Sequence, residues 1–309
     1  MKKILIGYDD SPGANAAIEQ LGDAGLPSEL DAIVMSVADV WLPSNPDKFE
    51  PAFPDPVPKS VRAAREHALQ AVEAARASAE GACARLRVLH AGWRVKAESC
   101  ADSPGWALVM KAASSHSDLV IVGSHGRGLL ERFFLGSVSQ RVAAEAFCSV
   151  RIVRDRGRSK DAPLRLLVAM DGSDDSRQAL ESLIARTWPK STEVRVATVI
   201  DPGLESSLAW SADFARQWVV DHDRGVEEGI CRRMEAWSAK LAQAGLQAET
   251  AIIRGDPKHE LLKAAEAWRA DAIFVGARGL QHGGRLALGT TANSVAARAH
   301  CTVEIVRPK

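Results

Sequence analysis

The sequence has no long apolar segment and no excess of charge of either sign. No run approaches about 18 apolar residues, so we expect no helix that spans a bilayer. Lys plus Arg and Asp plus Glu are both 39, so no net field attracts nucleic acid or an anionic membrane. The apolar stretch after Met1-Lys2-Lys3 is only Ile4-Leu5-Ile6, which is too short for a signal peptide core.

Cysteine pairs and the common catalytic signatures are also missing. The five cysteines are scattered without C-x-x-C spacing, and such a set fits reduced thiols. We therefore expect a cytoplasmic protein. The sequence has no G-x-S-x-G and no G-x-x-x-x-G-K-[ST], and His259-Glu260 lacks the second histidine of H-E-x-x-H. These absences argue against the most familiar hydrolases, phosphate-loop enzymes and zinc proteases.

What the sequence does contain is a glycine pattern that occurs twice. Gly123-Ser124-His125-Gly126 is followed, after nine residues, by Gly136-Ser137. Gly276-Ala277-Arg278-Gly279 leads through nine residues to Gly289-Thr290, and each glycine lies 153 residues after its counterpart. Turn geometry alone does not require the same gap twice. The two copies therefore indicate an internal repeat.

Each copy of the pattern follows a short apolar run, 118–122 in the first and 271–275 in the second. Such runs are typical of parallel strands buried on both faces. A glycine directly after the strand allows a sharp turn and the close approach of a ligand. Ser137 is the expected N-cap of a helix over 138–146, whose first-turn N–H groups suit an anion. Two glycine turns around one pocket fit a ribose at the first turn and phosphates at the second.

Alternating strands and helices predict an α/β fold of two tandem doubly wound (Rossmann-like) domains, each a five-stranded parallel sheet flanked by helices. We place the first domain at 1–154, a linker at 155–164 and the second domain at 165–309. A proline-rich segment at 41–58 excludes regular structure, and the basic run at 154–163 is interpreted as a solvated linker. In the first half we expect strands at 4–8, 32–37, 92–98, 118–122 and 150–153, and helices at 12–22, 60–82, 104–114 and 138–146.

The doubled pattern G-x2-G-x9-G-[S/T] resembles the nucleotide-binding signature of the universal stress protein family, in its ATP-binding branch. The resemblance covers nearly the whole chain. It implies ATP or a related adenine nucleotide as ligand, together with a metal ion for which Mg²⁺ is the candidate. The expected first site comprises Asp9, Val37, Gly123, Gly126, Arg127, Gly136, Ser137, Val138 and Ser139. The expected second site comprises Asp171, Val199, Gly276, Gly279, Gly289, Thr290 and Thr291.

Several of these residues have a simpler interpretation that the sequence leaves open. Asp9 and Asp171 end equivalent strands, where an aspartate either forms an Asx turn or, as the resemblance implies, contacts adenosine. Val37 and Val199 are either core valines or the small apolar residues that the family packs near adenine. The stripe of Trp210, Phe214 and Trp218 is interpreted as core or interface packing.

The two expected sites differ in their side chains. Arg127 and Ser139 in the first half correspond to Leu280 and Ala292 in the second, so we expect the first site to bind ATP more tightly. Arg132 does have a counterpart, Arg285. The risk to this expectation is Arg278, which can compensate in the second loop.

Three functional classes follow. The leading hypothesis is an ATP-binding stress or signalling protein with nucleotide occupancy as the signal. The second is a slow ATP-hydrolysing or phosphoryl-transfer enzyme, for which no dedicated catalytic set is found. The third is a structural module whose glycine loops are relics. We also expect the last strands, 150–153 and 303–306, to pair as an intramolecular pseudo-dimer, and a further homodimer and a protein partner stay open.

Overall fold

The structure is a computed structural model, and it describes residues 2–40, 59–126, 135–155, 157–159, 162–201, 226–279 and 288–308. The side chains of 226–228 are not described. Several features of the sequence lie outside these residues. They are the proline-rich segment at 41–58, the aromatic stripe of Trp210, Phe214 and Trp218, and the loop residues Arg127, Arg132, Leu280 and Arg285.

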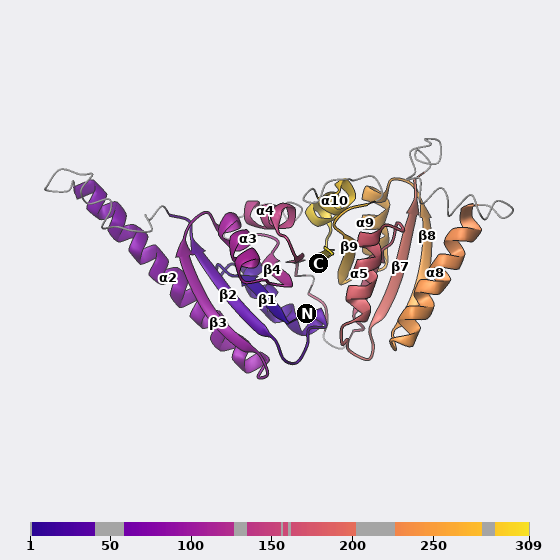
Figure 1. The fold of residues 1–309 in the computed structure, drawn as a ribbon, viewed down its shortest axis with the longest axis horizontal. Coiled ribbons are helices and arrows are strands. Elements are labelled where there is room, and N and C mark those ends of the chain that lie inside the picture. The colour runs from indigo at the N-terminus through magenta and orange to yellow at the C-terminus, as the bar shows by residue number, and fades with distance from the viewer. Residues whose placement is uncertain are drawn as a thin grey trace.

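The strands of both halves form one ten-stranded sheet in the order β3-β2-β1-β4-β5-β10-β9-β6-β7-β8 (Figure 1). Within each half all strands are parallel, as the apolar runs predict. The strands of the first half are β1 (Lys3–Gly7), β2 (Asp31–Ala38), β3 (Arg94–Ala101), β4 (Leu119–Gly123) and β5 (Ser149–Val153). Those of the second half are β6 (Arg165–Ala169), β7 (Glu193–Ile200), β8 (Gln247–Arg254), β9 (Ala272–Gly276) and β10 (Thr302–Val306).

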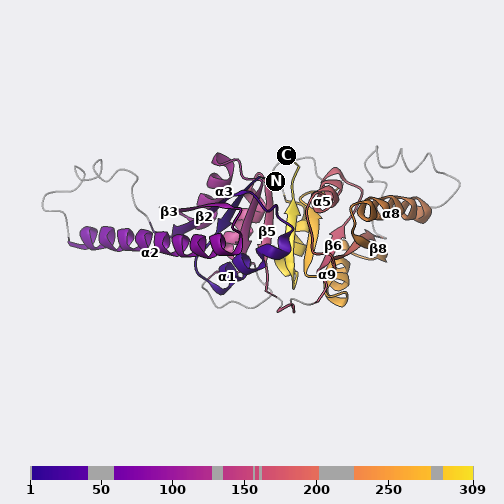
Figure 2. The same ribbon diagram turned by 90° about the horizontal axis from the view of Figure 1, so that it is seen from below.

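Helices cover both faces of the sheet (Figures 1 and 2). On one face α3, α4, α9 and α10 share a single apolar core that runs across both halves. On the other face two separate cores lie under α1 and α2 and under α5 and α8. The helices are α1 (Pro12–Glu19), the 3-10 helix η1 (Gln20–Ala24), α2 (Lys59–Leu89), α3 (Pro104–Ser114), α4 (Ser137–Glu145), α5 (Asp174–Ile184), α8 (Val226–Gln243), α9 (Pro257–Ala267) and α10 (Thr290–Arg298). The doubly wound α/β prediction is confirmed.

The two halves meet through their last strands, and the predicted pairing is confirmed. Antiparallel β5 and β10 place Ile152 opposite Val303, and Arg151 opposite Glu304. We call this strand pair the seam. Apolar residues alternate with polar or charged ones in both strands, as they do in edge strands. Every residue of both strands is nevertheless buried.

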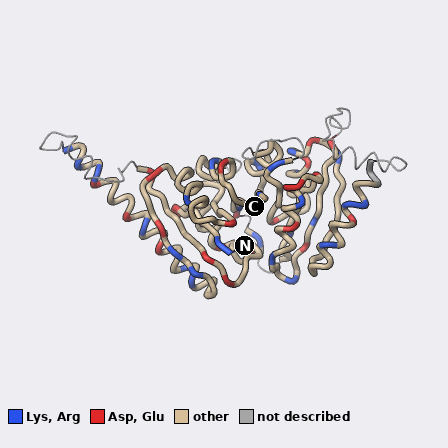
Figure 3. The backbone as a smooth tube through the Cα atoms, viewed as in Figure 1, with Lys and Arg blue, Asp and Glu red and all other residues tan. Residues whose placement is uncertain are grey.

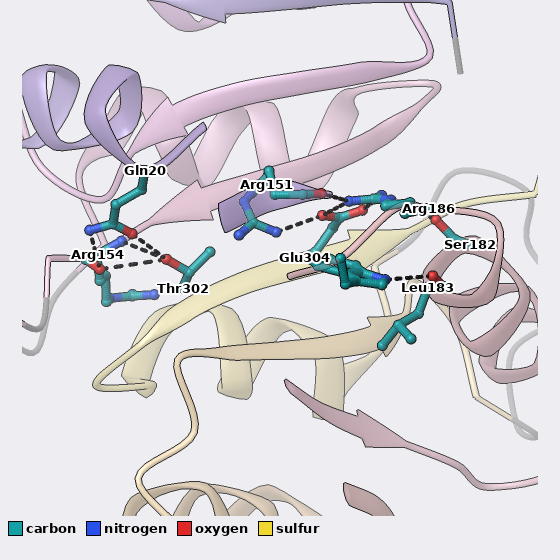
Figure 4. Close-up of polar contacts among 10 residues, drawn as sticks. Gln20, Arg151, Arg154, Ser182, Leu183, Arg186, Thr302 and Glu304 are labelled. Atoms are coloured by element: carbon teal, nitrogen blue, oxygen red, sulfur yellow. Dashed lines mark hydrogen bonds and ion pairs between the residues drawn. The ribbon is translucent and has the colours of Figure 1, made fainter. Parts of the chain in front are cut away.

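Charged side chains are therefore enclosed at the seam (Figure 4). Glu304 is 0% exposed, and its Oε2 accepts hydrogen bonds from Arg151 Nη1 and from Arg186 Nη1, each at 3.0 Å. Arg186 Nη2 also contacts Glu304 Oε1. Elsewhere acidic and basic residues are spread over both halves (Figure 3). In the described part of the chain, no helix has the length and apolar character needed to cross a membrane.

Three local predictions need correction. The long helix α2 ends at Leu89 rather than near 82. The helix of the first glycine loop begins at Ser137, so its N-cap is Gly136 and not Ser137. The basic run is not wholly solvated, because Arg154 is 6% exposed and Arg158 Nη2 lies 2.7 Å from Asp23 Oδ2. Composition alone does not distinguish a solvated arginine from one that reaches a helix end.

Candidate functional site

The predicted site residues gather at the carboxyl ends of the central strands in each half. Asp9 follows β1 and Gly123 ends β4, and these two strands are parallel neighbours. Asp171 and Gly276 have the same places after β6 and in β9. Chain order reverses at this point of the sheet, since the strand that follows β1 lies on its other side. In open α/β sheets, ligands bind at such a switch point.

The second glycine of each loop lies against the aspartate of the first strand. A Cβ added to Gly126 would lie 2.9 Å from Asp9 Oδ2, and a Cβ on Gly279 would lie 2.9 Å from Asp171 Oδ2. The other carboxylate oxygen of each aspartate accepts a backbone N–H two residues later, at 3.1 Å in the first half and 2.9 Å in the second. The Asx-turn interpretation is thus confirmed. The adenosine contact stays a prediction.

The first glycine of each loop has a packing role that the sequence does not reveal. A Cβ on Gly123 would lie 2.5 Å from the carbonyl carbon of Gly13, in the first turn of α1. A Cβ on Gly276 would lie 2.7 Å from the carbonyl carbon of Asp175 in α5. Glycine is required here because a helix backbone, rather than a ligand, takes up the space of the side chain.

The third glycine of each loop starts the helix that follows. Gly136 N donates to Ser124 O and Gly289 N donates to Ala277 O, each at 2.8 Å, so the loop closes on itself. Among the described residues neither helix start has a side-chain cap. The N–H groups in the first turn of a helix have no intrahelical partner and carry the positive end of its dipole. The starts of α4 and α10 therefore suit an anion.

Ser139 makes a hydrogen bond within the fold that the sequence does not reveal. Its side chain is buried, and its Oγ donates to Gly123 O at 2.6 Å. This hydrogen bond connects α4 to the end of β4. A contact between Ser139 and phosphate stays a prediction. Its counterpart Ala292 is also buried, as the shared core requires.

The second half contains a cavity of about 330 Å³ at this place. Its volume lies within the range of small-ligand pockets, roughly 300–1,000 Å³. All seven residues predicted for the second site line it: Asp171, Val199, Gly276, Gly279, Gly289, Thr290 and Thr291. Val199, like Val37 in the first half, is only partly buried and packs against the core, so the core interpretation holds for both and the adenine contact stays a prediction. Sequence reasoning missed the part of the wall that α8 and α9 supply, including Arg233, Trp237 and Lys258.

Arg278, the positive side chain that the structure describes in the second loop, is already paired. Arg278 Nε and Nη2 each lie 2.9 Å from a carboxylate oxygen of Asp175, and Arg278 N donates to Asp175 Oδ2 at 3.0 Å. Hydrogen bonding to Asp175 raises the pKa of Arg278. The sequence contains a signal for this pair. At the positions that correspond to Asp175 and Arg278, the first half has Gly13 and His125 instead. Both members of the pair change together.

In the first loop His125 replaces that arginine. Its Nδ1 lies 2.9 Å from Ser124 Oγ, and its Nε2 is buried without a hydrogen-bond partner in the described part of the chain. Burial and, to a smaller extent, the nearby charge of Arg154 lower the pKa of His125. The first loop therefore has a neutral imidazole at neutral pH where the second has a paired guanidinium. Of the first-site residues, Arg127 lies outside the described residues.

Comparison with known proteins agrees with this architecture. The model of the universal stress protein family matches residues 1–154 and 164–307. Universal stress protein YxiE of Bacillus subtilis is 31% identical over 149 residues, which are 46% of this chain and 98% of that protein. Universal stress protein Rv2623 of Mycobacterium tuberculosis is 23% identical over 310 residues, covering 98% of this chain and 96% of that protein. A crystal structure of a universal stress protein from Archaeoglobus fulgidus superposes with a TM-score of 0.61 at 20% identity, covering 99% of this chain and 96% of that one.

Proposed function

The chain belongs to the universal stress protein family, and from this premise we propose that it binds ATP or a related adenine nucleotide at both glycine loops. The observation that carries the proposal is the cavity of about 330 Å³, lined by all seven residues predicted for the second site. The first half repeats the close approach of its second loop glycine to an aspartate, at the same 2.9 Å.

In the proposed complex the nucleotide lies along the carboxyl edge of the sheet. Its ribose is near Asp171 and Gly279, and its base is near Val199. Its phosphates face the start of α10, where uncapped N–H groups and the Thr290 hydroxyl can donate. A side chain at position 279 would displace the Asp171 carboxylate, which the proposed ribose contact uses. In the first half Asp9, Val37, Gly126 and Ser137 have the matching places.

A Mg²⁺ ion, if it accompanies the nucleotide, is expected to be held mainly by phosphate oxygens and water. Within the described residues no three His, Cys, Asp or Glu side chains are grouped as metal ligands. Mg²⁺ sites with one or two carboxylates and substrate phosphates are common. Asp171, Asp201 and Asp256 line the cavity, and a carboxylate contact to the ion would come from among them.

We propose a signalling role rather than rapid catalysis. An ATP-hydrolysing enzyme requires a residue that positions water and charges that stabilise the leaving phosphate. In the second loop the guanidinium of Arg278 is engaged by Asp175, which leaves it poorly placed for the second task. We therefore expect any ATP turnover to be slower than the roughly 1–1,000 per second of ordinary enzymes. Phosphate release in that range, from protein free of contaminating ATPase, would refute this part of the proposal.

Nucleotide occupancy, in this proposal, is the signal that a cytoplasmic protein partner reads. The competing class is a structural module with relic loops. Mass spectrometry of small molecules released by denaturing the purified protein separates the two. We expect an adenine nucleotide, either carried through purification or retained after incubation with millimolar ATP and gel filtration. Release of none after both treatments would favour the structural module.

A further inference from the structure

Two arginines make the same contact in opposite directions across the seam. Arg154 follows β5 in the first half, and its Nη2 donates to Ala296 O at 2.6 Å and, less closely, to the next carbonyl at 3.3 Å. These carbonyls belong to the last turn of α10, in the second half. Arg307 follows β10, and its Nη2 donates to Ala143 O at 2.6 Å and to the next carbonyl at 3.5 Å. Those carbonyls belong to the last turn of α4.

The backbone around each arginine repeats this exchange. Arg154 N donates to Thr302 Oγ1 at 3.3 Å, and Arg307 N donates to Ser149 Oγ at 3.2 Å. Thr302 and Ser149 are the first residues of β10 and β5. Each of these contacts has its counterpart 153 residues away in the other set, while Arg307 Nη1 makes one further contact, to Cys148 O at 3.4 Å. The arrangement is thus a property of the repeat and not of one local loop.

The contacted helices are the two whose starts form the candidate anion sites. The last carbonyls of a helix lack intrahelical partners and carry the negative end of its dipole, so a cation there is favourable. Burial lowers the pKa of Arg154 to about 10, and its guanidinium stays protonated at neutral pH. Each helix has nine residues and is therefore only about 13 Å long. Fixing the C-terminal end of so short a helix therefore restricts the directions in which its N-terminal amides can point.

We propose that Arg154 and Arg307 are reciprocal positioning residues, each of which orients the anion-binding helix of the opposite half. Arg307 thus belongs functionally to the first site and Arg154 to the second. This inference rests on the proposed nucleotide binding for its effect on affinity, whereas its effect on the helices does not. It makes each half incomplete as a binding unit without the other.

The affinity test uses the full chain with one site blocked. In a Gly279→Val background only the first site binds ATP, and in a Gly126→Val background only the second does. We expect Arg307→Ala to weaken the first site about three- to thirtyfold and the second less than twofold. Arg154→Ala should do the reverse. Arg158→Ala, which removes a neighbouring arginine that pairs with Asp23, is the matched control and should change neither site.

Local damage from Arg154→Ala would weaken the first site, because Arg154 adjoins β5, beside the first loop. A weaker second site therefore distinguishes the proposal from local damage. Lysine at either position keeps the charge and should restore most of the lost affinity. If each arginine instead weakens the site of its own half, or both sites equally, the proposal is wrong. Where an alanine variant fails to fold, Arg307→Gln and Arg154→Gln remove the charge with a smaller loss of volume and replace it in the affinity test.

Hydrogen exchange of the nucleotide-free protein separates this inference from the proposed function. Arg307→Ala, or Arg307→Gln if alanine is not tolerated, should speed exchange in α4 and leave α10 unchanged, and the Arg154 variants should do the opposite. This result supports the positioning role even if the wild-type chain binds no ATP, in which case only the proposed function fails. Unchanged exchange in the opposite half's helix would overturn the inference even if ATP binds.

Discussion

At the residue scale, the two candidate sites differ most where Gly13 and His125 of the first half correspond to Asp175 and Arg278 of the second. The Asp175 carboxylate is nearly buried and accepts three hydrogen bonds from Arg278. Breaking this pairing to contact a phosphate would leave a buried carboxylate without its cation, which is costly. Arg278 is therefore a poor substitute for a cation dedicated to the ligand.

The first site should accordingly bind ATP more tightly than the second. The sequence predicts a contact between Arg127 and phosphate, and such a charge-assisted hydrogen bond would contribute roughly 1.5–3 kcal/mol, or about one to two decades in affinity, which Leu280 cannot replace. Calorimetry on Gly279→Val and Gly126→Val chains measures the first and second sites separately. Arg127→Leu in the Gly279→Val chain should remove the difference. Equal affinities in the two blocked chains, or a tighter second site, would mean that backbone N–H groups alone determine binding.

Ser139→Ala should lower stability more than it lowers affinity. The buried hydroxyl donates to Gly123 O at 2.6 Å, and losing the bond leaves that carbonyl without this donor. We expect the free energy of unfolding, from urea denaturation, to fall by about 1–2 kcal/mol. ATP affinity at the first site should change less than threefold. A tenfold loss of affinity with unchanged stability would instead identify Ser139 as a phosphate ligand.

Residue types and spacing were enough to identify the candidate site but not every role within it. The spacing of Gly276, Gly279 and Gly289 predicts residues that do line one cavity. The same pattern does not show that Gly276 faces the backbone of Asp175 instead of a ligand. That role depends on how closely α5 approaches β9, a tertiary distance with no local sequence signal.

At the element scale, the close approach of helix and strand makes the two kinds of glycine distinguishable by mutation. Gly123→Ala should destabilise the chain by about 1–3 kcal/mol, since its Cβ would lie 2.5 Å from the backbone of Gly13. Gly81 lies inside α2 with nothing within 4 Å of its would-be Cβ, and Gly81→Ala should stabilise by about 0.5–1 kcal/mol. Thermal unfolding of both variants tests the pair. Equal shifts would show that the loop glycine is not packed as described.

The elements themselves were largely predictable because the apolar runs and helix periods are strong. Helix α3 is predicted and found at the same residues, 104–114, with Pro104 at its first turn. Helix α2 extends beyond its predicted end because residues such as Leu86 pack into the core there. The helix at Ser137 begins one residue early because Gly136 adopts the extended cap conformation itself.

At the scale of the whole molecule, the pairing of β5 with β10 at the seam joins the sheets of the two halves into one. This pairing also buries Glu304, a charged residue whose place in the alternating pattern is typical of an edge strand. The alternation of apolar and polar residues in the last strands, together with the family resemblance, predicts their pairing. The partnership of Glu304 with Arg186 was not, because Arg186 comes from a distant part of the chain, just after α5. No residue spacing in a sequence predicts a long-range ion pair of this kind.

Stability should depend on Glu304 in a defined pH range. Burial alone would raise the pKa of Glu304, but the charges of Arg186 and Arg151 outweigh it and keep the pKa below its ordinary value of 4.5. Its contribution to stability is therefore complete above pH 4.5 and is lost as the pH falls toward the lower folded pKa. Urea denaturation between pH 7 and pH 3 should show this loss in the wild type and a weaker one in Glu304→Gln.

At neutral pH Glu304→Gln should cost about 3–5 kcal/mol, because two buried guanidinium groups lose their counter-charge. Glu249→Gln is the matched control. It breaks a more exposed pair with Arg195, for which less than about 1 kcal/mol is expected. Equal costs for the two variants would show that the seam charges contribute no more than surface ones.

The central claim, that both glycine loops bind an adenine nucleotide, is tested most directly by the stoichiometry of ATP binding to ligand-stripped protein. Isothermal titration calorimetry should give two ATP per wild-type chain, one per chain for Gly126→Val or Gly279→Val, and none for the double variant. Circular dichroism of the double variant should match the wild type. Absence of saturable heat at millimolar ATP in the wild type, or unchanged binding in a folded double variant, would contradict the account.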